Sequence, residues 1–185
     1  MLPEISLNIL DIAQNSISAE ASLIHIKVET DSDRCLLTVT VADNGHGMTE
    51  EMLTTVTDPF FTTRTTRSVG LGIPFFRQAA ECTGGSFSIQ SACGRGTAVK
   101  ACFHTDHIDC MPLGDINATI LGLITMNPAI DFVYERRTDA RSFVLDTREI
   151  REILGEVLLD LPEVSEFIQS YLEENETEIN ETIEE

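Results

Sequence analysis

Two pairs of alternating segments restrict the fold of this chain more than any other feature. Residues 23–29 (LIHIKVE) and 36–43 (LLTVTVAD) alternate apolar and polar side chains, and residues 86–92 (SFSIQSA) and 97–103 (TAVKACF) repeat the pattern. A period of two is typical of strands that bury one face. A short polar turn links the members of each pair, so the sequence predicts two hairpins.

Helical patterns precede the hairpins. Residues 5–17 carry an apolar stripe at helical spacing, and residues 73–84 predict a helix with Pro74 in its first turn and Gly84 at its end. A shorter helix is expected over 49–56. This order predicts an α+β fold, a two-layer α/β sandwich whose helices lie on one face of a mixed, largely antiparallel sheet.

The second half of the chain differs in charge. The net charge is −19; the first 104 residues carry 11 acids and 7 bases, whereas the remainder carries 20 acids and 5 bases. We therefore expect a domain over 1–104, a small α+β extension over 105–172 and an acidic tail over 173–185 that is frayed or disordered at its end. In the extension, Asp115 and Asp146 are expected to cap helices that flank another hairpin.

The charge and the composition limit the environment and the partners of the chain. So acidic a protein repels nucleic-acid phosphates and anionic membrane surfaces, so we expect it to bind neither nucleic acid nor membrane. No apolar run is long enough to span a bilayer, and no signal peptide is evident. Five cysteines, an odd number without a CxxC pair, favour reduced thiols and a cytoplasmic location.

An acid and an amide lie in register on the first predicted helix. Asp11 and Asn15 are one turn apart, on a stripe next to the apolar one. An ordinary solvated face would account for them. A site that needs both a proton acceptor and an oxygen ligand would account for them as well.

The second strand runs directly into the segment DNGHGM, which contains Asp43, Gly45 and Gly47. The glycines let the backbone turn sharply and let a flat ligand approach, while the carboxylate can accept a hydrogen bond from an exocyclic amine. Taken alone, the pattern is explained as well by a tight turn with a local Asp–backbone bond.

A further glycine pair, Gly70 and Gly72, precedes the helix at 73–84. Unhindered amides at a helix start can bind phosphate, and Arg64 and Arg67 lie in the Thr-rich loop just before them. The segment lacks the third glycine of a dinucleotide fingerprint and the lysine of a P-loop.

These motifs follow one another in an order that resembles the GHKL ATPases of the Bergerat fold, the superfamily of DNA gyrase B, histidine kinases and MutL. DIAQNSISAEAS resembles their N box, DNGHGM the G1 box, PFFTTR the F box and lid, VGLGI the G2 box, and GRGTAV the G3 element. The resemblance spans residues 1–104 and is nearest to the catalytic ATP-binding domain of histidine kinases.

The resemblance implies ATP and Mg²⁺ as cofactors and a role for each matching residue. Asn15 would coordinate Mg²⁺, and Asp11 would orient or deprotonate the attacking group. Asp43 would bind the adenine amino group with support from Thr97. The other residues implied to contact the nucleotide are Gly45, Gly47, Arg64, Gly70, Leu71 and Gly72.

Two departures from the family pattern bear on activity. Ser18 stands where kinases often carry a basic residue, and Ser68 replaces the first glycine of the usual GxGLG. Charge neutralisation would then fall on Mg²⁺, Arg64 and Arg67.

No dimerisation helices with an acceptor histidine precede the motifs, so the resemblance implies a signalling phosphotransferase or ATPase that acts on a protein partner, as anti-sigma-factor serine kinases do. The alternative is a non-catalytic ATP-binding switch. The acidic C-terminal half is the expected surface for a protein partner or for a homodimer.

A rival site is suggested by the segment CFHTDHIDC. Cys102, His104, His107 and Cys110 lie within nine residues, and all four side chains can ligate zinc. Their spacing matches no common zinc finger, and a polar strand end explains it equally well.

Overall fold

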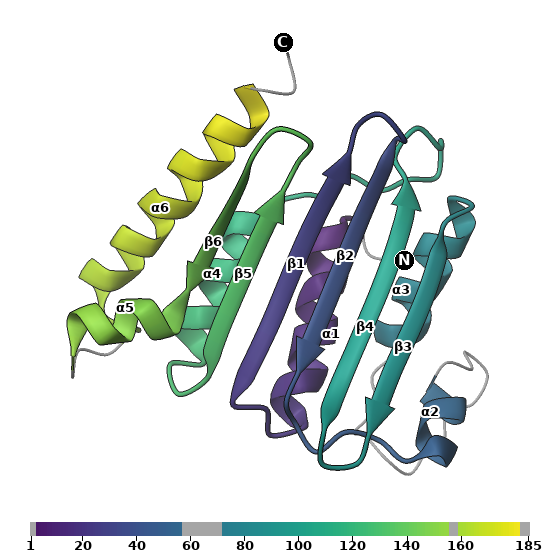
Figure 1. Cartoon of the computed structure of the whole chain (residues 1–185), viewed down its shortest axis with the longest axis horizontal. Helices are drawn as coiled ribbons and strands as arrows, with labels where there is room; N and C mark the ends of the chain where they lie inside the picture. Colours follow the sequence, from purple (N-terminus) through teal and green to yellow (C-terminus); the bar gives the residue numbers. More distant parts are fainter. Residues whose placement is uncertain (1–2, 57–71, 156–158, 182–185) are drawn as a thin grey trace.

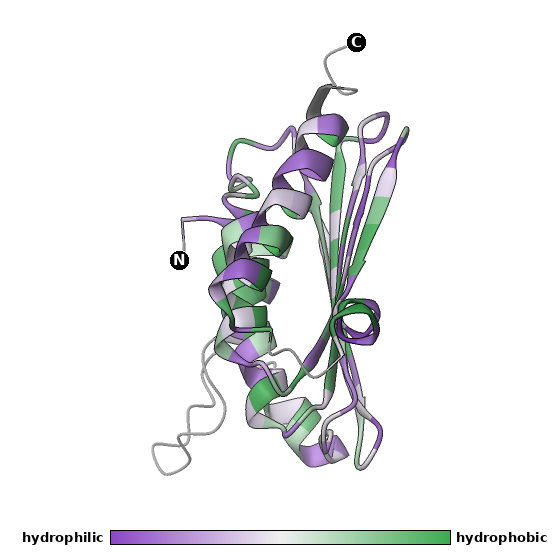
Figure 2. Cartoon of the chain, turned by 90° about the vertical axis from the view of Figure 1, so that its left-hand side faces the viewer, coloured by the Kyte–Doolittle hydropathy of each residue, from purple (hydrophilic) through white to green (hydrophobic). Residues whose placement is uncertain are grey.

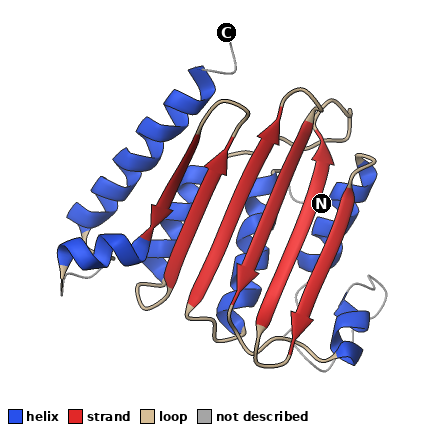
Figure 3. Ribbon diagram, viewed as in Figure 1, coloured by secondary structure: helices blue, strands red, loops and turns tan. Residues whose placement is uncertain are grey.

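The computed structural model describes residues 3–56, 72–155 and 159–181, and it arranges them as a central sheet with helices beside it (Figures 1 and 3). The elements, in chain order, are α1 Ile5–Ser18, β1 Leu23–Asp31, β2 Leu36–Asp43, α2 Glu50–Val56, α3 Gly72–Cys82, β3 Ser86–Ala92, β4 Gly96–His104, α4 Ile116–Met126, β5 Asp131–Arg137, β6 Ser142–Asp146, α5 Thr147–Leu154 and α6 Pro162–Glu181.

The sheet has six strands in the order β3-β4-β2-β1-β5-β6. Its neighbours are antiparallel except for β1 and β5, which run parallel with Leu23 opposite Asp131. The predicted mixed, largely antiparallel sheet is therefore confirmed. The hairpins β1–β2 and β3–β4 form as the alternation predicts, and β4 pairs with β2 to join them.

The helices α1, α3, α4 and α6 cover one face of the sheet, whereas α5 lies toward the other face beside β5 and β6 and leaves the rest of that face open (Figure 2). On β1, Ile24, Ile26 and Val28 are buried beneath the helices. The intervening Lys27 lies on the open face, where its ammonium pairs with the carboxylates of Glu29 and Glu135 at 3.1 and 3.2 Å. The alternation of the strand thus reflects one covered face and one solvated face.

The change from a weakly to a strongly acidic sequence near residue 105 does not mark the end of the sheet. The hairpin β5–β6 continues the sheet beyond β1, and α4 packs beside α1. Both predicted caps are present, because Asp115 Oδ1 accepts from Ala118 N and Asp146 Oδ1 accepts from Arg148 N, each at 2.9 Å. The division into domains remains a prediction.

The end of the predicted acidic tail, residues 182–185, lies outside the described residues, so its expected fraying stays a prediction, whereas residues 173–181 are helical. The helix α6 continues to Glu181, and it buries Ile168, Leu172 and Ile179. The apolar stripe persists through the acidic segment, so one side of the helix packs while Glu173, Glu174 and Glu178 face water. Among the helices of the described residues, none combines the length and the apolar character that crossing a bilayer requires.

Candidate functional site

A cavity of about 140 Å³ lies between α1, the ends of β2 and β4, the loop after β2, and the helices α2 and α3. Its wall is largely apolar, with Ile12, Val41, Met48, Ile73 and Val99 among the lining residues. Three polar residues singled out by the sequence, Asn15, Asp43 and Thr97, also line it. A cavity of this kind holds a mostly apolar ligand and orients it through a few polar groups.

The carboxylate of Asp43 is fixed by three hydrogen bonds. Its Oδ1 accepts from the backbone N–H groups of Gly45 and Thr97 at 2.9 and 3.2 Å, and its Oδ2 accepts from the Ser16 hydroxyl at 2.7 Å. An ionised carboxylate has about four acceptor positions. One position therefore remains for a donor that enters the cavity.

Thr97 supports Asp43 through its backbone, because its hydroxyl is engaged elsewhere. Thr97 Oγ1 lies 2.8 Å from the hydroxyl of Ser91, which in turn accepts from the N–H of Met48 at 2.8 Å. This chain of contacts ties the end of β4 to β3 and to the loop after β2. The acceptor on Asp43 is consequently held in one orientation.

Two serines of this site were not identified from the sequence. Ser16 belongs to the buried stripe of α1 and directly follows Asn15, but its partner Asp43 is 27 residues away. A hydroxyl within an otherwise apolar stripe is the signal that could have found it. Ser91 lies in an ordinary alternating strand, where no local signal distinguishes it.

The two glycines of the DNGHGM segment are required by the protein's own backbone. Gly47 has φ +67°, and a side chain there would collide with the carbonyl of Ala92. A Cβ at Gly45 would lie 2.5 Å from the carbonyl oxygen of Ala19, which accepts a hydrogen bond from His46 N. The loop is thus pressed against the end of α1 and the β3–β4 turn, while the predicted contacts of Gly45 and Gly47 with a ligand stay predictions.

Asp11 and Asn15 face the same region from α1. The side-chain nitrogen of Asn15 is buried and has no hydrogen-bond partner within the described structure. Asp11 is half-buried, and this burial raises the pKa of its carboxyl above the ordinary value. Gly72 opens α3 directly against it, since a Cβ on Gly72 would lie 3.0 Å from the Asp11 Cβ.

The remaining predicted nucleotide contacts, Arg64, Gly70 and Leu71, lie outside the described residues, as do Arg67 and Ser68. Of the others, Asn15, Asp43, Gly47 and Thr97 line the cavity, and Gly45 adjoins it through its bond to Asp43. Asp11 and Gly72 lie against each other and are not among the lining residues.

The structure does not support the alternative zinc site predicted from the sequence. No group of three or more His, Cys, Asp or Glu side chains in the described part of the chain is placed to hold a metal ion. Cys102 and His104 lie on β4, whereas His107 and Cys110 lie in the following turns. There, His107 Nδ1 accepts from Asp109 N at 3.2 Å, and Cys110 Sγ donates to the carbonyl of Met111.

Two features together define the class of GHKL ATPase domains. One is a mixed sheet covered on one face by helices, and the other is a fixed carboxylate in an apolar cavity beside the first helix. Residues 1–107 match the family described as histidine kinase-, DNA gyrase B-, and HSP90-like ATPase. The chain belongs to this family.

Two curated relatives carry the name of sensor proteins. The chain is 31% identical over 103 residues to a candidate sensor protein of Shewanella frigidimarina, and 31% identical over 93 residues to the sensor protein ChvG of Agrobacterium fabrum. These alignments cover 55% and 48% of the chain but only 15% of each relative. The likeness therefore concerns one segment of much longer proteins.

A solved structure shows the same fold. The chain resembles the MutL ATPase domain of Aquifex aeolicus, determined in complex with ADP, with a TM-score of 0.50 and 13% identity. The match covers 83% of this chain and 70% of that one, so it extends beyond the residues that match the family.

Proposed function

We propose that the chain binds ATP together with Mg²⁺ and acts as a signalling phosphotransferase or ATPase on a protein partner. The observation that carries this proposal is the free acceptor position of Asp43 in an apolar cavity. Adenine has apolar faces and an amino group on its edge, so it can fill the cavity and donate to Asp43. Guanine carries a carbonyl oxygen at the equivalent position. This oxygen and the Asp43 carboxylate are both acceptors, so they could not form a hydrogen bond.

Asn15 on α1 is suited to hold Mg²⁺. Magnesium prefers oxygen ligands and is held in proteins by one or two side chains together with substrate phosphates. The amide of Asn15 has its buried nitrogen unpartnered, and rotation by 180° would put its oxygen in that position. Asn15 would hold the ion, which would neutralise charge on the phosphates when bound.

Asp11 is suited to accept a proton. Its carboxyl is partly withdrawn from water, and the raised pKa makes it a stronger base than an exposed aspartate. It lies one turn from Asn15 on the same side of α1. We assign to it the orientation or deprotonation of the group that attacks the terminal phosphate.

One observation favours the second candidate, an ATP-binding switch without turnover. No lysine or arginine occurs among the described residues that line the cavity. Ser18, which stands where kinases often carry a basic residue, donates its hydroxyl to the carbonyl of Gln14 at 2.9 Å. Charge on the phosphates would then be neutralised less completely, which slows phosphoryl transfer more than it weakens binding.

Calorimetric titration with ATP and GTP, with and without Mg²⁺, tests the proposal. We expect ATP to bind more tightly than GTP and to bind more tightly with Mg²⁺. Equal affinities for the two nucleotides would contradict the role of Asp43. A phosphate-release assay, with and without protein acceptors from a cell extract, separates the enzyme from the switch.

A further inference from the structure

A second hollow lies at the edge of the sheet, beside the strand β6. The elements β6, α5 and α6 enclose a groove of about 300 Å³. Its apolar and aromatic side chains are Val144, Leu145, Ile150, Ile153, Leu154, Phe167 and Tyr171. Three of them are strongly exposed, with Val144 at 49%, Ile153 at 83% and Phe167 at 59% of their full surface. Large apolar side chains gathered on one surface are typical of interaction sites.

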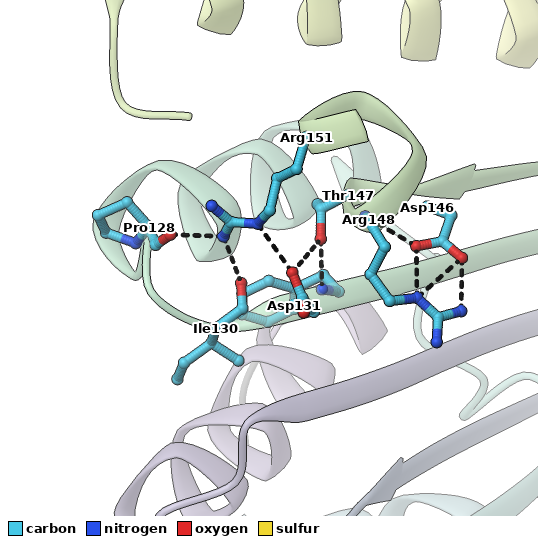
Figure 4. A network of polar contacts seen from close by, with 8 residues as sticks. Pro128, Ile130, Asp131, Asp146, Thr147, Arg148 and Arg151 are labelled. Carbon is cyan, nitrogen blue, oxygen red and sulfur yellow. Dashed lines mark hydrogen bonds and ion pairs between the residues drawn. The ribbon is translucent and has the colours of Figure 1, made fainter. Parts of the chain in front are cut away.

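The wall formed by α5 is held by polar contacts, which Figure 4 shows. Arg151 Nε donates to Asp131 Oδ1 at 2.9 Å, and Arg151 Nη2 donates to the carbonyl of Pro128 at 2.5 Å. At the start of the helix, Asp146 accepts from the backbone and the guanidinium of Arg148. The helix is therefore fixed against β5 and the end of α4, and the groove is formed before any partner arrives.

The groove suits the insertion of side chains better than the addition of a strand to β6. The carbonyl of Val144, in the middle of β6, already accepts a hydrogen bond from the Tyr171 hydroxyl at 3.0 Å. A partner strand that paired along β6 would have to compete for this group. A helix contributes only side chains and leaves the bond intact.

The rim of the groove is acidic. Glu149 lines it, and Glu163 lies one helical turn before Phe167 on α6. No ion pair among the described residues includes either glutamate, whereas both arginines of α5 are paired, Arg148 with Asp146 and Arg151 with Asp131. The groove therefore presents apolar anchors beside two glutamates that form no ion pair among the described residues.

We propose that this groove docks a basic amphipathic helix of a partner protein. Apolar side chains spaced at i, i+3, i+4 and i+7 would contact Ile153 and Phe167, while lysines or arginines would face Glu149 and Glu163. A second copy of the chain, or an anionic lipid surface, would bring like charge against the rim. The inference goes beyond the proposed function, since no residue of the groove lines the cavity.

Fluorescence anisotropy with a labelled 18-residue peptide tests the inference. The probe contains only leucine and lysine, with the leucines on one helical face. One control peptide has the same composition in an order that spreads the leucines around the helix, and a second has glutamate in place of lysine. We expect saturable binding of the probe, weakened by salt, and at least tenfold weaker binding of both controls.

Variants of the full chain locate the binding site. The double variant Ile153→Ser/Phe167→Ser removes the two most exposed anchors, and we expect it to weaken binding at least tenfold. Ile108→Ser is the matched control, because Ile108 is 95% exposed in the loop after β4; we expect it to bind the probe like the wild type. Thermal melting by circular dichroism checks that both variants fold.

Three outcomes would overturn the inference. The first is equal binding of the probe and the shuffled peptide, which would indicate attraction to charge alone. The second is unchanged binding by the double variant. The third is a dimer of the wild-type chain in sedimentation equilibrium that Phe167→Ser converts to a monomer, because the groove would then be an interface between copies.

Discussion

The cavity beside α1 and the groove beside β6 depart from ordinary burial in opposite ways. At the cavity, the carboxylate of Asp43 lies in the wall and accepts three hydrogen bonds, and one of its acceptor positions remains free. At the groove, the large apolar side chains of Ile153 and Phe167 remain in water. Polar groups inside and large apolar groups outside are the two informative exceptions to normal burial. The comparison teaches that the cavity suits a small ligand with a polar edge, whereas the groove at the β6 edge suits a larger apolar surface.

A buried ion pair between β5 and α6 is satisfied less completely than Asp43. Arg136 Nε on β5 and Glu176 Oε1 on α6 are 3.6 Å apart, and their side chains are only 5% and 16% exposed. The hydroxyl of Tyr134 and Glu176 Oε2 are buried without a partner in the described structure. Burial, with the nearby charge of Glu176, raises the pKa of Tyr134 and keeps its hydroxyl neutral. We expect this cluster to contribute to the attachment of α6 and to have no role in ligand binding.

The largest expected effect concerns catalysis at the cavity end. Asp11→Asn should lower phosphate release or partner phosphorylation by about 10²–10⁴-fold, the usual contribution of a positioned base, while ATP binding is retained. Asn15→Ala should instead lose the Mg²⁺-dependent part of ATP binding. Steady-state kinetics and calorimetry on both variants measure the difference. Wild-type rates in Asp11→Asn would show that Asp11 is not the base.

The pH dependence of turnover sharpens the same assignment. A base must be deprotonated to act, and burial raises the pKa of Asp11. As the pH is lowered, the rate should therefore begin to fall at a higher pH than a fully exposed aspartate would give. This acidic limb should be absent from the residual activity of Asp11→Asn.

The next effect concerns stability at the buried ion pair between β5 and α6. Glu176→Ala strands the buried guanidinium of Arg136, which should lower the free energy of unfolding by about 3 kcal/mol; this is the low end of the usual cost, since Arg136 keeps its bond to Thr30. Glu174→Ala, on an exposed position of the same helix, is the control. Urea denaturation measures both variants. Equal stability of the two would show that the ion pair does not hold α6.

A smaller effect is expected on nucleotide affinity. Asp43→Ala removes the acceptor placed for the adenine amine, and a lost hydrogen bond to a charged group costs about 1.5–3 kcal/mol, or roughly tenfold to hundredfold in affinity. Ser16→Ala removes one of three donors to Asp43 and should cost less. Titration with ATP and GTP should show that Asp43→Ala loses the preference for ATP. An intact preference would place adenine elsewhere.

The smallest effect concerns the wall of the groove. Asp146→Ala removes the cap of α5 and its bond to Arg148, and should lower stability by about 1 kcal/mol. Hydrogen bonds from Arg148 lower the pKa of the Asp146 carboxyl below the ordinary aspartate value. The contribution is therefore complete above that ordinary value, about 3.9 in an unfolded chain, and is lost as the pH falls through the lower folded value. Thermal melts of both proteins should converge in acid; a constant difference would assign the effect to packing.

Local signals in the sequence predicted most of the fold, whereas contacts between distant segments were not predicted. The alternation of β1 and β2 and the caps Asp115 and Asp146 depend on neighbours in the chain, and all are confirmed. The bond from Ser16 to Asp43 depends on how α1 is rotated over the sheet, which no local pattern encodes. The continuation of α6 was missed because the count of carboxylates concealed the spacing of Leu172 and Ile179.

The parallel pairing of β1 with β5 has a consequence for how the chain is made. Leu23 emerges from the ribosome more than a hundred residues before its partner Asp131. Until then the nine-residue strand β1 is an unpaired edge of the nascent sheet, which can pair with other chains. Closing so long a loop is also slow. Translation pauses or chaperone contacts before residue 137 should therefore set the yield of native protein, even though every predicted nucleotide contact has by then been synthesised.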